Sequence, residues 1–280
     1  MVKIAIVTGA ASGLGLALCS ELLHRGYRVA MFSRDAVQLE KEAASLGARG
    51  QVIALPGDVT DANRVREAVE YVEATWGPIQ LAIANAGIRD PTWVKEFPLE
   101  LAKKLMETNY FGMLHLFDAV TPRMLARRQG CFAGIASIAG VRCLPGGSGY
   151  GASKAAMQAF LDTARLELAP CGVEVVTVNP WFIRSSAKDD SASRPLMVDA
   201  PWAARTIVSG IEAGRTQIEF PFLPSLLWKL IRVLPNRVYA WLFGPRENRS
   251  SIGLGVLMFV SSRLPRHRSM SRPARGPDER

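Results

Sequence analysis

A tyrosine and a lysine stand four positions apart in the run Tyr150-Gly151-Ala152-Ser153-Lys154. On a helix, side chains at this spacing lie on the same face. A free tyrosine has a pKa of about 10 and is a poor base at neutral pH, but a neighbouring cation favours the phenolate. Tyr150 could then take a proton from an alcohol, or give one to a carbonyl, while a hydride moves. A surface tyrosine and lysine are the alternative interpretation, so other residues must decide.

A glycine cluster occurs near the N-terminus, in Thr8–Gly15. Gly9 permits a tight turn, Gly13 lets the backbone approach a pyrophosphate, and Gly15 allows close helix–strand packing. The cluster follows the apolar run Lys3–Val7 and precedes a helical pattern, whose free N–H groups and positive dipole end attract phosphates. Glycines also make ordinary loops. The position between a strand and a helix favours nucleotide binding.

The second apolar run, Arg28–Phe32, is followed by Ser33, Arg34 and Asp35. In a dinucleotide fold this position meets the adenosine ribose, where an acidic residue accepts from the 2′-hydroxyl and repels a 2′-phosphate. Ser33 occupies the tip, and the planar guanidinium of Arg34 suits a phosphate. These residues therefore favour NADP over NAD. The alternative is that Ser33 or Asp35 caps the next helix and that Arg34 is solvated.

Further motifs follow one another along the chain. They are Asp58-Val59 and Asn85-Ala86-Gly87 after the third and fourth apolar runs, Asn109 in a long helical pattern, Ser137 after the fifth run, and Asn179-Pro180 after the sixth. With the glycine turn and the tyrosine–lysine pair, this order resembles the classical short-chain dehydrogenase/reductase (SDR) family. The resemblance extends over Val2–Phe220.

The resemblance implies a catalytic group of four residues. Tyr150 would be the general acid/base, and Ser137 would bind and position the substrate oxygen. Lys154 would lower the tyrosine pKa and bind the nicotinamide ribose, and Asn109 would hold a water that extends the proton relay. The nicotinamide would perform the hydride chemistry. Taken singly, Ser137 could cap a turn, Asn109 could bond only backbone, and Asp58 could cap the helix that follows it.

The resemblance also implies a set of cofactor-binding residues. In this set Asp58 and Val59 face the adenine, and Ile183 and Ser185 flank the nicotinamide carboxamide. The complete expected set is Thr8, Gly9, Ser12, Gly13, Leu14, Gly15, Ser33, Arg34, Asp58, Val59, Asn85, Ala86, Gly87, Tyr150, Lys154, Pro180, Ile183 and Ser185.

Two positions depart from the family pattern. Ala84 stands where an asparagine is usual, and Asn85 could partly replace the lost amide. Trp181 follows Pro180, where the family has glycine. Trp181 either points away from the cofactor and forms one wall of the substrate pocket, or packs against Phe182 or the C-terminal segment. The segment after Ser185 is interpreted as a mobile lid.

Short apolar runs alternate with helical patterns over most of the chain. The expected strands are Lys3–Val7, Arg28–Phe32, Gln51–Leu55, Ile79–Ala84, Cys131–Ala136, Val173–Val178 and Gln217–Phe220. The expected helices are Leu14–Arg25, Ala36–Leu46, Asp61–Thr75, Leu99–Arg128, Tyr150–Leu168 and Trp202–Glu212. Short, continuously apolar strands fit a sheet covered on both faces, and the alternation fits parallel pairing. The ligand should lie beyond the carboxyl ends of the strands.

We therefore predict an α/β fold with a Rossmann-type doubly wound parallel sheet of about seven strands, helices on both faces and a helical, apolar C-terminal extension. The expected domains are an NADP-binding catalytic domain over residues 1–220, an apolar and basic extension over 221–262 that packs on the domain or at a membrane surface, and a disordered basic tail over 263–280.

The expected extension mixes aromatic, apolar and basic residues. Its prolines exclude one long helix but allow two short ones, Ser225–Leu234 and Asn236–Phe243. A second apolar patch follows at Ile252–Val260, and then comes the arginine-rich tail. Such a composition suits a membrane interface, a dimer contact or a wall over an apolar pocket. We hypothesise peripheral association with an anionic membrane and an apolar or lipid-like substrate.

Composition also bears on metal binding, cellular location and partners. The net charge is +9, from 34 basic and 25 acidic residues, and much of the excess lies near the C-terminus. The four cysteines form no C-x-x-C pair and the three histidines are scattered, so we expect no metal site and a reducing, cytoplasmic location. No secretory signal is visible, and no apolar run approaches the roughly 18 residues of a membrane span. Nucleic acid is not an expected partner.

The sequence predicts an oxidoreductase that uses NADPH to reduce a carbonyl, or runs the reverse alcohol oxidation, with Tyr150 as the acid/base. In this family the helix pair Leu99–Arg128 and Tyr150–Leu168 commonly builds a dimer or tetramer, so the resemblance implies a homo-oligomer. Two alternatives stay open. One is an NADP-binding sensor or scaffold protein that keeps the fold, and the other is an epimerase or dehydratase on the same scaffold.

Overall fold

The computed structural model describes residues 2–47, 50–184 and 197–243 of the chain. It divides into two compact units, Met1–Leu234 and Pro235–Arg280. The first unit holds the sheet and every candidate catalytic residue. The described part of the second holds the helix α9 (Asn236–Phe243). The first unit extends past the expected domain boundary at residue 220 to include the first helix of the extension.

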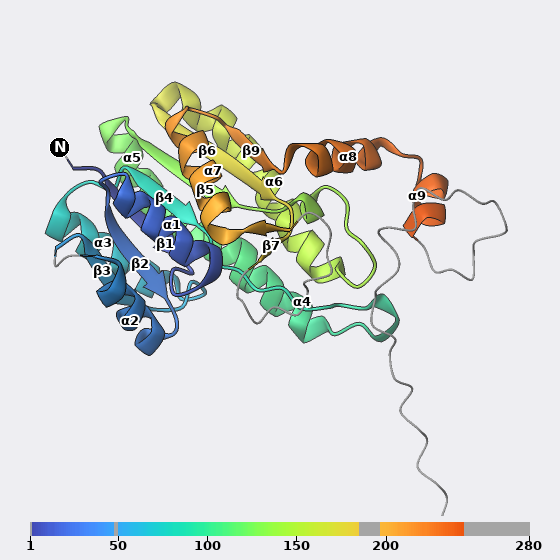
Figure 1. The fold of residues 1–280 in the computed structure, drawn as a ribbon, viewed down its shortest axis with the longest axis horizontal. Helices are drawn as coiled ribbons and strands as arrows, with labels where there is room; N and C mark the ends of the chain where they lie inside the picture. The colour runs from blue at the N-terminus through green and yellow to red at the C-terminus, as the bar shows by residue number, and fades with distance from the viewer. Residues whose placement is uncertain (1, 48–49, 185–196, 244–280) are drawn as a thin grey trace, which may run out of the picture. The chain divides into compact units, whose positions relative to one another are not determined.

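A parallel sheet of seven strands forms the centre of the first unit, in the order β3-β2-β1-β4-β5-β6-β9 (Figure 1). The strands are β1 (Ile4–Thr8), β2 (Arg28–Ser33), β3 (Val52–Pro56), β4 (Leu81–Ala84), β5 (Gly130–Ile135), β6 (Val173–Pro180) and β9 (Gln217–Phe220). The order reverses between β1 and β4, which is the point where doubly wound sheets bind ligands. Two short strands, β7 (Ile183–Arg184) and β8 (Val198–Asp199), pair separately.

The first unit contains eight α-helices among the described residues. They are α1 (Gly13–His24), α2 (Ala36–Leu46), α3 (Ala62–Trp76), α4 (Leu99–Met106), α5 (Gly112–Arg127), α6 (Ser148–Leu168), α7 (Ala200–Glu212) and α8 (Phe222–Val233), with 3₁₀ turns η1 (Val94–Glu96), η3 (Ile138–Gly140) and η4 (Ala169–Cys171). Buried side chains of α1, α2 and α7 form one core with the sheet, and those of α3, α5 and α6 form the other. The predicted doubly wound fold is confirmed.

The predicted continuous helix Leu99–Arg128 is wrong in one respect. A π-helical turn, η2 (Glu107–Phe111), separates α4 from α5, and the Gly112 N–H bonds to the Glu107 carbonyl. A π turn adds one residue to the helical repeat, a local change that a periodic apolar pattern does not reveal. The inserted turn contains Asn109, whose side chain is fully buried.

The helix α8 begins earlier than predicted, at Phe222 in place of Ser225. Pro224 lies in its first turn, where a backbone N–H has no acceptor inside the helix, so the ring is tolerated there. The residue Pro221 occupies the N-cap position. No helix in residues 2–47, 50–184 or 197–243 is long and apolar enough to cross a membrane.

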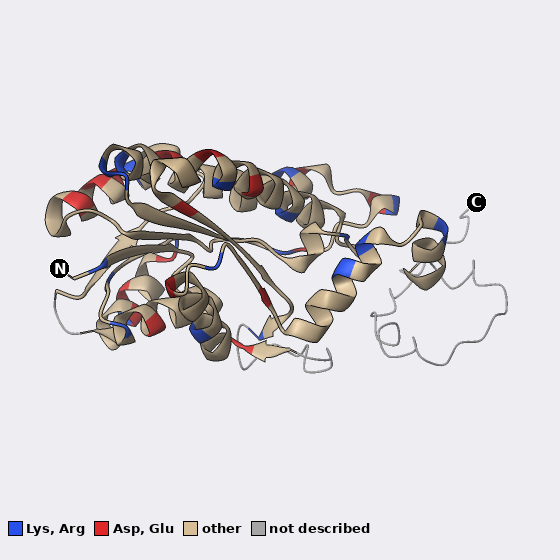
Figure 2. Ribbon diagram, turned by 90° about the horizontal axis from the view of Figure 1, so that it is seen from above, with Lys and Arg blue, Asp and Glu red and all other residues tan. Residues whose placement is uncertain are grey.

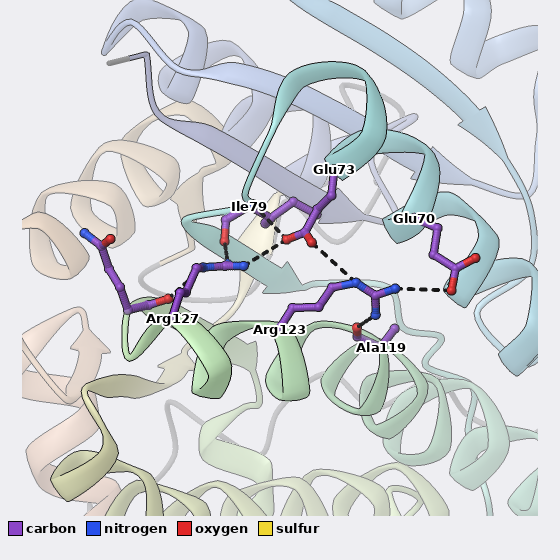
Figure 3. A network of polar contacts seen from close by, with 7 residues as sticks. Glu70, Glu73, Ile79, Ala119, Arg123 and Arg127 are labelled. Atoms are coloured by element: carbon purple, nitrogen blue, oxygen red, sulfur yellow. Dashed lines mark hydrogen bonds and ion pairs between the residues drawn. The ribbon is translucent and has the colours of Figure 1, made fainter.

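A polar network ties α3 to α5 and to the start of β4 (Figure 3). Glu73 lies 3.3 Å from Arg123 Nε and 3.0 Å from Arg127 Nη1, and it accepts a 3.1 Å hydrogen bond from the Ile79 N–H. Arg123 also reaches Glu70 at 3.1 Å. Glu73 is the most buried of these charges, so its two ion pairs are screened less than exposed ones. The network joins α3 to α5 and is structural.

Candidate active site

A cleft of about 320 Å³ lies beyond the carboxyl ends of β1, β2 and β4, within the size range of ligand pockets. Twelve residues of the expected cofactor set line it: Gly9, Ser12, Gly13, Leu14, Gly15, Ser33, Arg34, Asp58, Val59, Asn85, Ala86 and Gly87. Three other lining residues were missed, namely Gly57, Ile88 and Thr108. Each of the three is next in the chain to a residue of a recognised motif, and this adjacency could have identified it as a cleft residue.

The glycine turn after β1 is packed so tightly that a side chain would not fit at two of its positions, and its backbone lines the cleft directly. Gly9 and Gly13 have positive φ angles, +66° and +54°. A Cβ at Gly9 would lie 2.8 Å from Ala86 Cα, and one at Gly15 would collide with the Gly9 carbonyl oxygen. The free N–H groups at the start of α1 border the resulting cradle. This arrangement fits the pyrophosphate of a dinucleotide.

Thr8 and Asn85 fasten this turn to β4. The buried Thr8 hydroxyl accepts hydrogen bonds from the N–H groups of Asn85, at 3.0 Å, and Ala86, at 3.1 Å. The Asn85 amide donates to the Thr8 carbonyl at 2.9 Å. Asn85 thus supplies a side-chain amide beside Ala84, where the family has one more asparagine. Thr8 itself does not line the cleft but supports it from behind.

At the tip of β2 the acidic side chain is engaged elsewhere. Asp35 is the N-cap of α2 and accepts from the Gln38 N–H at 3.0 Å. Ser33 and Arg34 line the cleft, and the half-exposed Arg34 guanidinium lies 3.6 Å from Asp58. Asp58 does not cap α3, because Asp61 does. The tip therefore presents a cation to the cleft, balanced by one carboxylate across it.

The Asn109 side chain links two segments next to the cleft, at Ile88 and Ser153. Its amide nitrogen donates to the Ile88 carbonyl at 3.0 Å and to the Ser153 hydroxyl at 2.9 Å, and its oxygen accepts from the Ile88 N–H at 2.8 Å. Both amide hydrogens are therefore used by the protein. A water in the expected relay could bind only the remaining lone pair of this oxygen or the Asn109 backbone carbonyl.

Tyr150 lies in the first turn of α6, next to Ser137 at the end of β5. Burial raises the pKa of Tyr150, and a hydrogen bond with Ser137 and the charge of Arg89 act against that rise. The Ser137 hydroxyl also accepts from the Ala139 N–H at 3.2 Å, so it both caps η3 and contacts the tyrosine. Tyr150 therefore holds its proton at neutral pH, which is the form that a general acid needs.

Lys154 lies one turn after Tyr150, with its Nζ 5.8 Å from the tyrosine ring centroid. It is buried, donates to the Ile135 carbonyl at 2.7 Å, and has its pKa lowered to about 7 by burial. In this structure the groups that lower the Tyr150 pKa are Ser137 and Arg89. Burial disfavours the charged form of Lys154, so the expected effect of Lys154 on the tyrosine stays a prediction.

Gly87 links the tyrosine–lysine pair to the cofactor cleft. A Cβ at Gly87 would lie 3.2 Å from Asn109 Oδ1 and 3.6 Å from Lys154 Nζ. Asn109 and Lys154 therefore lie next to the cleft at Gly87, and Tyr150, with Ser137 hydrogen-bonded to it, lies beside Lys154. None of the four is among the residues that line the cleft itself. Transfer of a group between a bound dinucleotide and a neighbouring substrate requires that the reacting groups be held close together in this way.

Sequence reasoning missed two polar residues beside this group. Arg89, two residues after the Asn85-Ala86-Gly87 motif, lies 5.8 Å above the Phe182 ring and acts on Tyr150. Gln158, one turn after Lys154, donates at 2.7 Å to the Ser137 carbonyl and at 2.7 Å to Asn179 Oδ1. Gln158 shares the helix face of Tyr150 and Lys154, a spacing that could have identified it.

The end of β6 carries the aromatic departure from the family pattern. Trp181 packs edge-to-face on Phe182, with centroids 5.3 Å apart, and on Trp228 of α8, at 5.7 Å. Contact with Phe182 and the C-terminal segment was one of the two expected arrangements. Pro180 ends β6 and Ile183 begins β7, both outside the cleft lining. Ser185 and the segment interpreted as a lid lie outside the described residues.

Comparison with known proteins adds independent findings. The model of the short chain dehydrogenase family matches residues 3–195. An uncharacterized oxidoreductase of Myxococcus xanthus is 33% identical over 241 residues, which cover 85% of this chain and 94% of that protein. A dehydrogenase/reductase SDR family protein 7-like of Anopheles gambiae is 34% identical, covering 88% of this chain and 84% of the relative.

Solved structures show the same architecture. A short chain dehydrogenase from Burkholderia cenocepacia in complex with NADP has a TM-score of 0.75 and 28% identity, covering 87% of this chain and 98% of that one. A short-chain dehydrogenase from Streptomyces avermitilis also has a TM-score of 0.75, at 24% identity, covering 86% and 96%. At that lower identity the second likeness concerns the fold alone.

Proposed function

The chain belongs to the short-chain dehydrogenase/reductase family of oxidoreductases, and on that premise we propose that it uses NADPH to reduce the carbonyl group of an apolar substrate. The observation that carries the proposal is the grouping of Tyr150, Ser137 and Lys154 next to the glycine-lined cleft. When bound, the nicotinamide supplies the hydride. The chain's own residues supply position and the proton.

The residues of the cleft fit a dinucleotide. The cradle at Gly9, Gly13 and Gly15 would receive the pyrophosphate, because only glycine leaves room there for close backbone approach. Asp58 and Val59 would face the adenine. At the other end, Lys154, which donates to the Ile135 carbonyl at 2.7 Å, would bind the ribose hydroxyls. These are proposed roles.

Tyr150 and Ser137 would handle the substrate oxygen. The Ser137 hydroxyl would donate to the carbonyl and hold it beside the tyrosine. As the carbon becomes tetrahedral, the oxygen gains charge, and the Tyr150 hydroxyl would transfer its proton to it. Lys154, whose Nζ lies 5.8 Å from the tyrosine ring centroid, and Arg89, whose charge lowers the tyrosine pKa, would stabilise the phenolate that remains. In the reverse direction Tyr150 would accept the proton from the alcohol.

The cofactor preference follows from Arg34. Its guanidinium lines the cleft, whereas Asp35, the acidic residue that could exclude a 2′-phosphate, caps α2. The neighbouring protein from Burkholderia cenocepacia was solved with NADP, which agrees with this preference. We therefore propose NADP as the cofactor of this chain.

Arg34→Ala should raise the KM for NADPH about 10- to 50-fold and change the KM for NADH less than about twofold. The physical reason is that only the 2′-phosphate would lose its charged partner. Initial rates with each cofactor at saturating substrate measure both values. Arg28→Ala is a suitable control, because that guanidinium lies over Trp76 and outside the cleft. An equal effect on both cofactors would contradict the proposed phosphate contact.

The apolar nature of the substrate is proposed from the aromatic residues next to the site. Trp181, Phe182 and Trp228 form a continuous edge-to-face set between β6 and α8. Purified protein with NADPH should therefore reduce long-chain aldehydes or ketones at least about tenfold more efficiently, in kcat/KM, than short polar carbonyls. A panel that varies only chain length measures this directly. A preference for short polar carbonyls would contradict it.

We further propose a cytoplasmic homo-oligomer, formed through the helices α4, α5 and α6. Phe111 and Leu166 are exposed apolar residues in this part of the molecule, at the end of η2 and on α6. Such residues suit a subunit contact. Light scattering on the purified protein would give its oligomeric state.

A further inference from the structure

The helix α8 carries a row of exposed apolar side chains. Phe222, Leu223, Leu226, Leu227, Leu230 and Val233 each expose between 44% and 77% of their surface. At about 100° per residue they fill one continuous arc of the helix, which we call the outer face of α8. Monomeric proteins scatter such residues singly over their surface. A whole helix face of this kind marks a surface that contacts something else.

The charged side chains of α8 itself are all basic. The helix α8 contains Lys229 and Arg232 and no acidic residue (Figure 2). Both basic residues are exposed, and Lys229 also pairs with Glu219 of β9 at 2.7 Å. Residues 221–275 contain one acidic residue, Glu247, and the following basic residues: Lys229, Arg232, Arg237, Arg246, Arg249, Arg263, Arg266, Arg268, Arg272 and Arg275. This charge is complementary to an anionic surface.

The opposite, inner face of α8 is fastened to the active site. The Trp228 indole donates to the Arg142 carbonyl at 3.1 Å, and its ring packs on Trp181. In return, Arg142 Nη1 donates to the Ile231 carbonyl at 3.1 Å and to the Leu234 carbonyl at 2.9 Å. Arg142 lies between the two catalytic residues Ser137 and Tyr150 in the chain. The helix α8 is therefore anchored to the loop that joins them.

We propose that the outer face of α8 docks on an anionic lipid bilayer, with its apolar side chains in the headgroup boundary and its basic side chains at lipid phosphates. An amphipathic helix needs no complementary groove to enter this boundary, since the acyl chains adapt to it. A second copy of the chain is the less favoured occupant, because a symmetric contact would bring two cationic helices together. The helix is too short to span, so the contact is peripheral.

Docking through α8 would also affect the active site, because the inner face of α8 contacts a loop of that site. This step rests on the proposed function. Because Trp228 and Arg142 join α8 to the Ser137–Tyr150 loop, a docked α8 holds that loop at the membrane surface. An apolar carbonyl compound dissolved in the bilayer could then reach the site without crossing water. The substrate class that this geometry favours is a membrane-dissolved aldehyde or ketone.

Flotation of the full chain with phosphatidylcholine vesicles, with and without phosphatidylserine, tests the docking. At low salt the wild type should bind the phosphatidylserine vesicles. The double variant Leu223→Gln/Leu227→Gln should lower the partition coefficient about tenfold or more, since two side chains no longer enter the apolar layer. Arg232→Gln should lower it about fivefold for the anionic vesicles alone.

A matched control is Val37→Gln/Tyr71→Gln, which removes two exposed apolar side chains from α2 and α3 and should leave vesicle binding unchanged. Reduction of a water-soluble carbonyl by NADPH should be the same in all these variants, so a failure of the proposed function is seen separately. The docking is overturned if the wild type does not bind the anionic vesicles or if the α8 variant binds equally well. It is also overturned if the α8 variant turns a stable oligomer into a monomer.

Discussion

Tyr150→Phe will bind NADPH as the wild type does and will lose about 1,000-fold in kcat/KM for carbonyl reduction. The substitution removes one hydroxyl and leaves the ring, which lies 5.8 Å from Lys154 Nζ, in place. No other described group combines contact with Ser137 and a proton to give at neutral pH. Initial rates of NADPH oxidation and a fluorescence titration of NADPH binding measure the two quantities separately.

The pH dependence of the reaction provides a second readout for the same residue. Burial raises the pKa of Tyr150, so the proton needed for reduction is held throughout the neutral range and is lost only above the usual tyrosine pKa. The reduction rate should therefore decline on the alkaline side. Tyr71→Phe, which removes the hydroxyl of an exposed tyrosine on α3, is the control and should change neither rate nor binding. Retention of more than a tenth of the activity by Tyr150→Phe would rule the residue out as the acid.

Lys154→Met will reduce carbonyl turnover about 100-fold or more and will nevertheless stabilise the cofactor-free protein at pH 6. Burial lowers the pKa of Lys154 from 10.5 to about 7, which corresponds to a penalty on the order of 5 kcal/mol for the charged form. Methionine has a similar shape and no charge. The lost hydrogen bond to the Ile135 carbonyl offsets about 1–2 kcal/mol of this gain.

The effect of Lys154→Met on stability should change with pH, and this pH dependence would identify the buried charge of Lys154 as the cause. Below pH 7 the lysine is charged in both the folded and unfolded protein, so wild type bears the full penalty. Between pH 7 and 10.5 the unfolded chain binds more protons than the folded one, so wild-type stability rises with pH. The Tm difference between Lys154→Met and wild type should thus be positive at pH 6 and vanish or reverse near pH 10.

Thermal unfolding across this pH range measures the difference. Lys41→Met, which removes an exposed ammonium from α2, should show no such trend. A lower Tm of Lys154→Met at pH 6 would mean that the buried ammonium contributes net stability, contrary to the desolvation argument. Loss of activity without loss of stability would separate a role at the site from a role in the fold.

The parts of the site that the sequence predicted are those fixed by local chemistry. A positive φ at Gly9 and a collision at Gly15 can be read from spacing, because only glycine serves there. Tyr150 and Lys154 share a helix face by spacing alone. The strands could be predicted because short, continuously apolar runs in an α/β fold are mostly strands of a sheet that is covered on both faces.

The parts that could not be predicted depend on distant contacts or on solvent exclusion. The sequence left open whether Ser33 or Asp35 caps the next helix, and only the folded chain shows that Asp35 does. The reciprocal contacts of Arg142 with α8 join residues about 90 positions apart. The pKa of Lys154 depends on complete burial, which no residue type encodes. Arg89 acts on Tyr150 through space, from a loop of another strand.

The position of α8 in the chain also determines when its outer face is first exposed during synthesis. Each sheet pair is parallel, so each needs a crossover and none can form as a local hairpin. β9 is the last strand among the described residues, and α8 follows it directly. During synthesis from the N-terminus, α8 emerges from the ribosome after every residue of the site, when its inner face can pack at once. An exposed apolar helix appearing earlier would be an aggregation risk to the nascent chain.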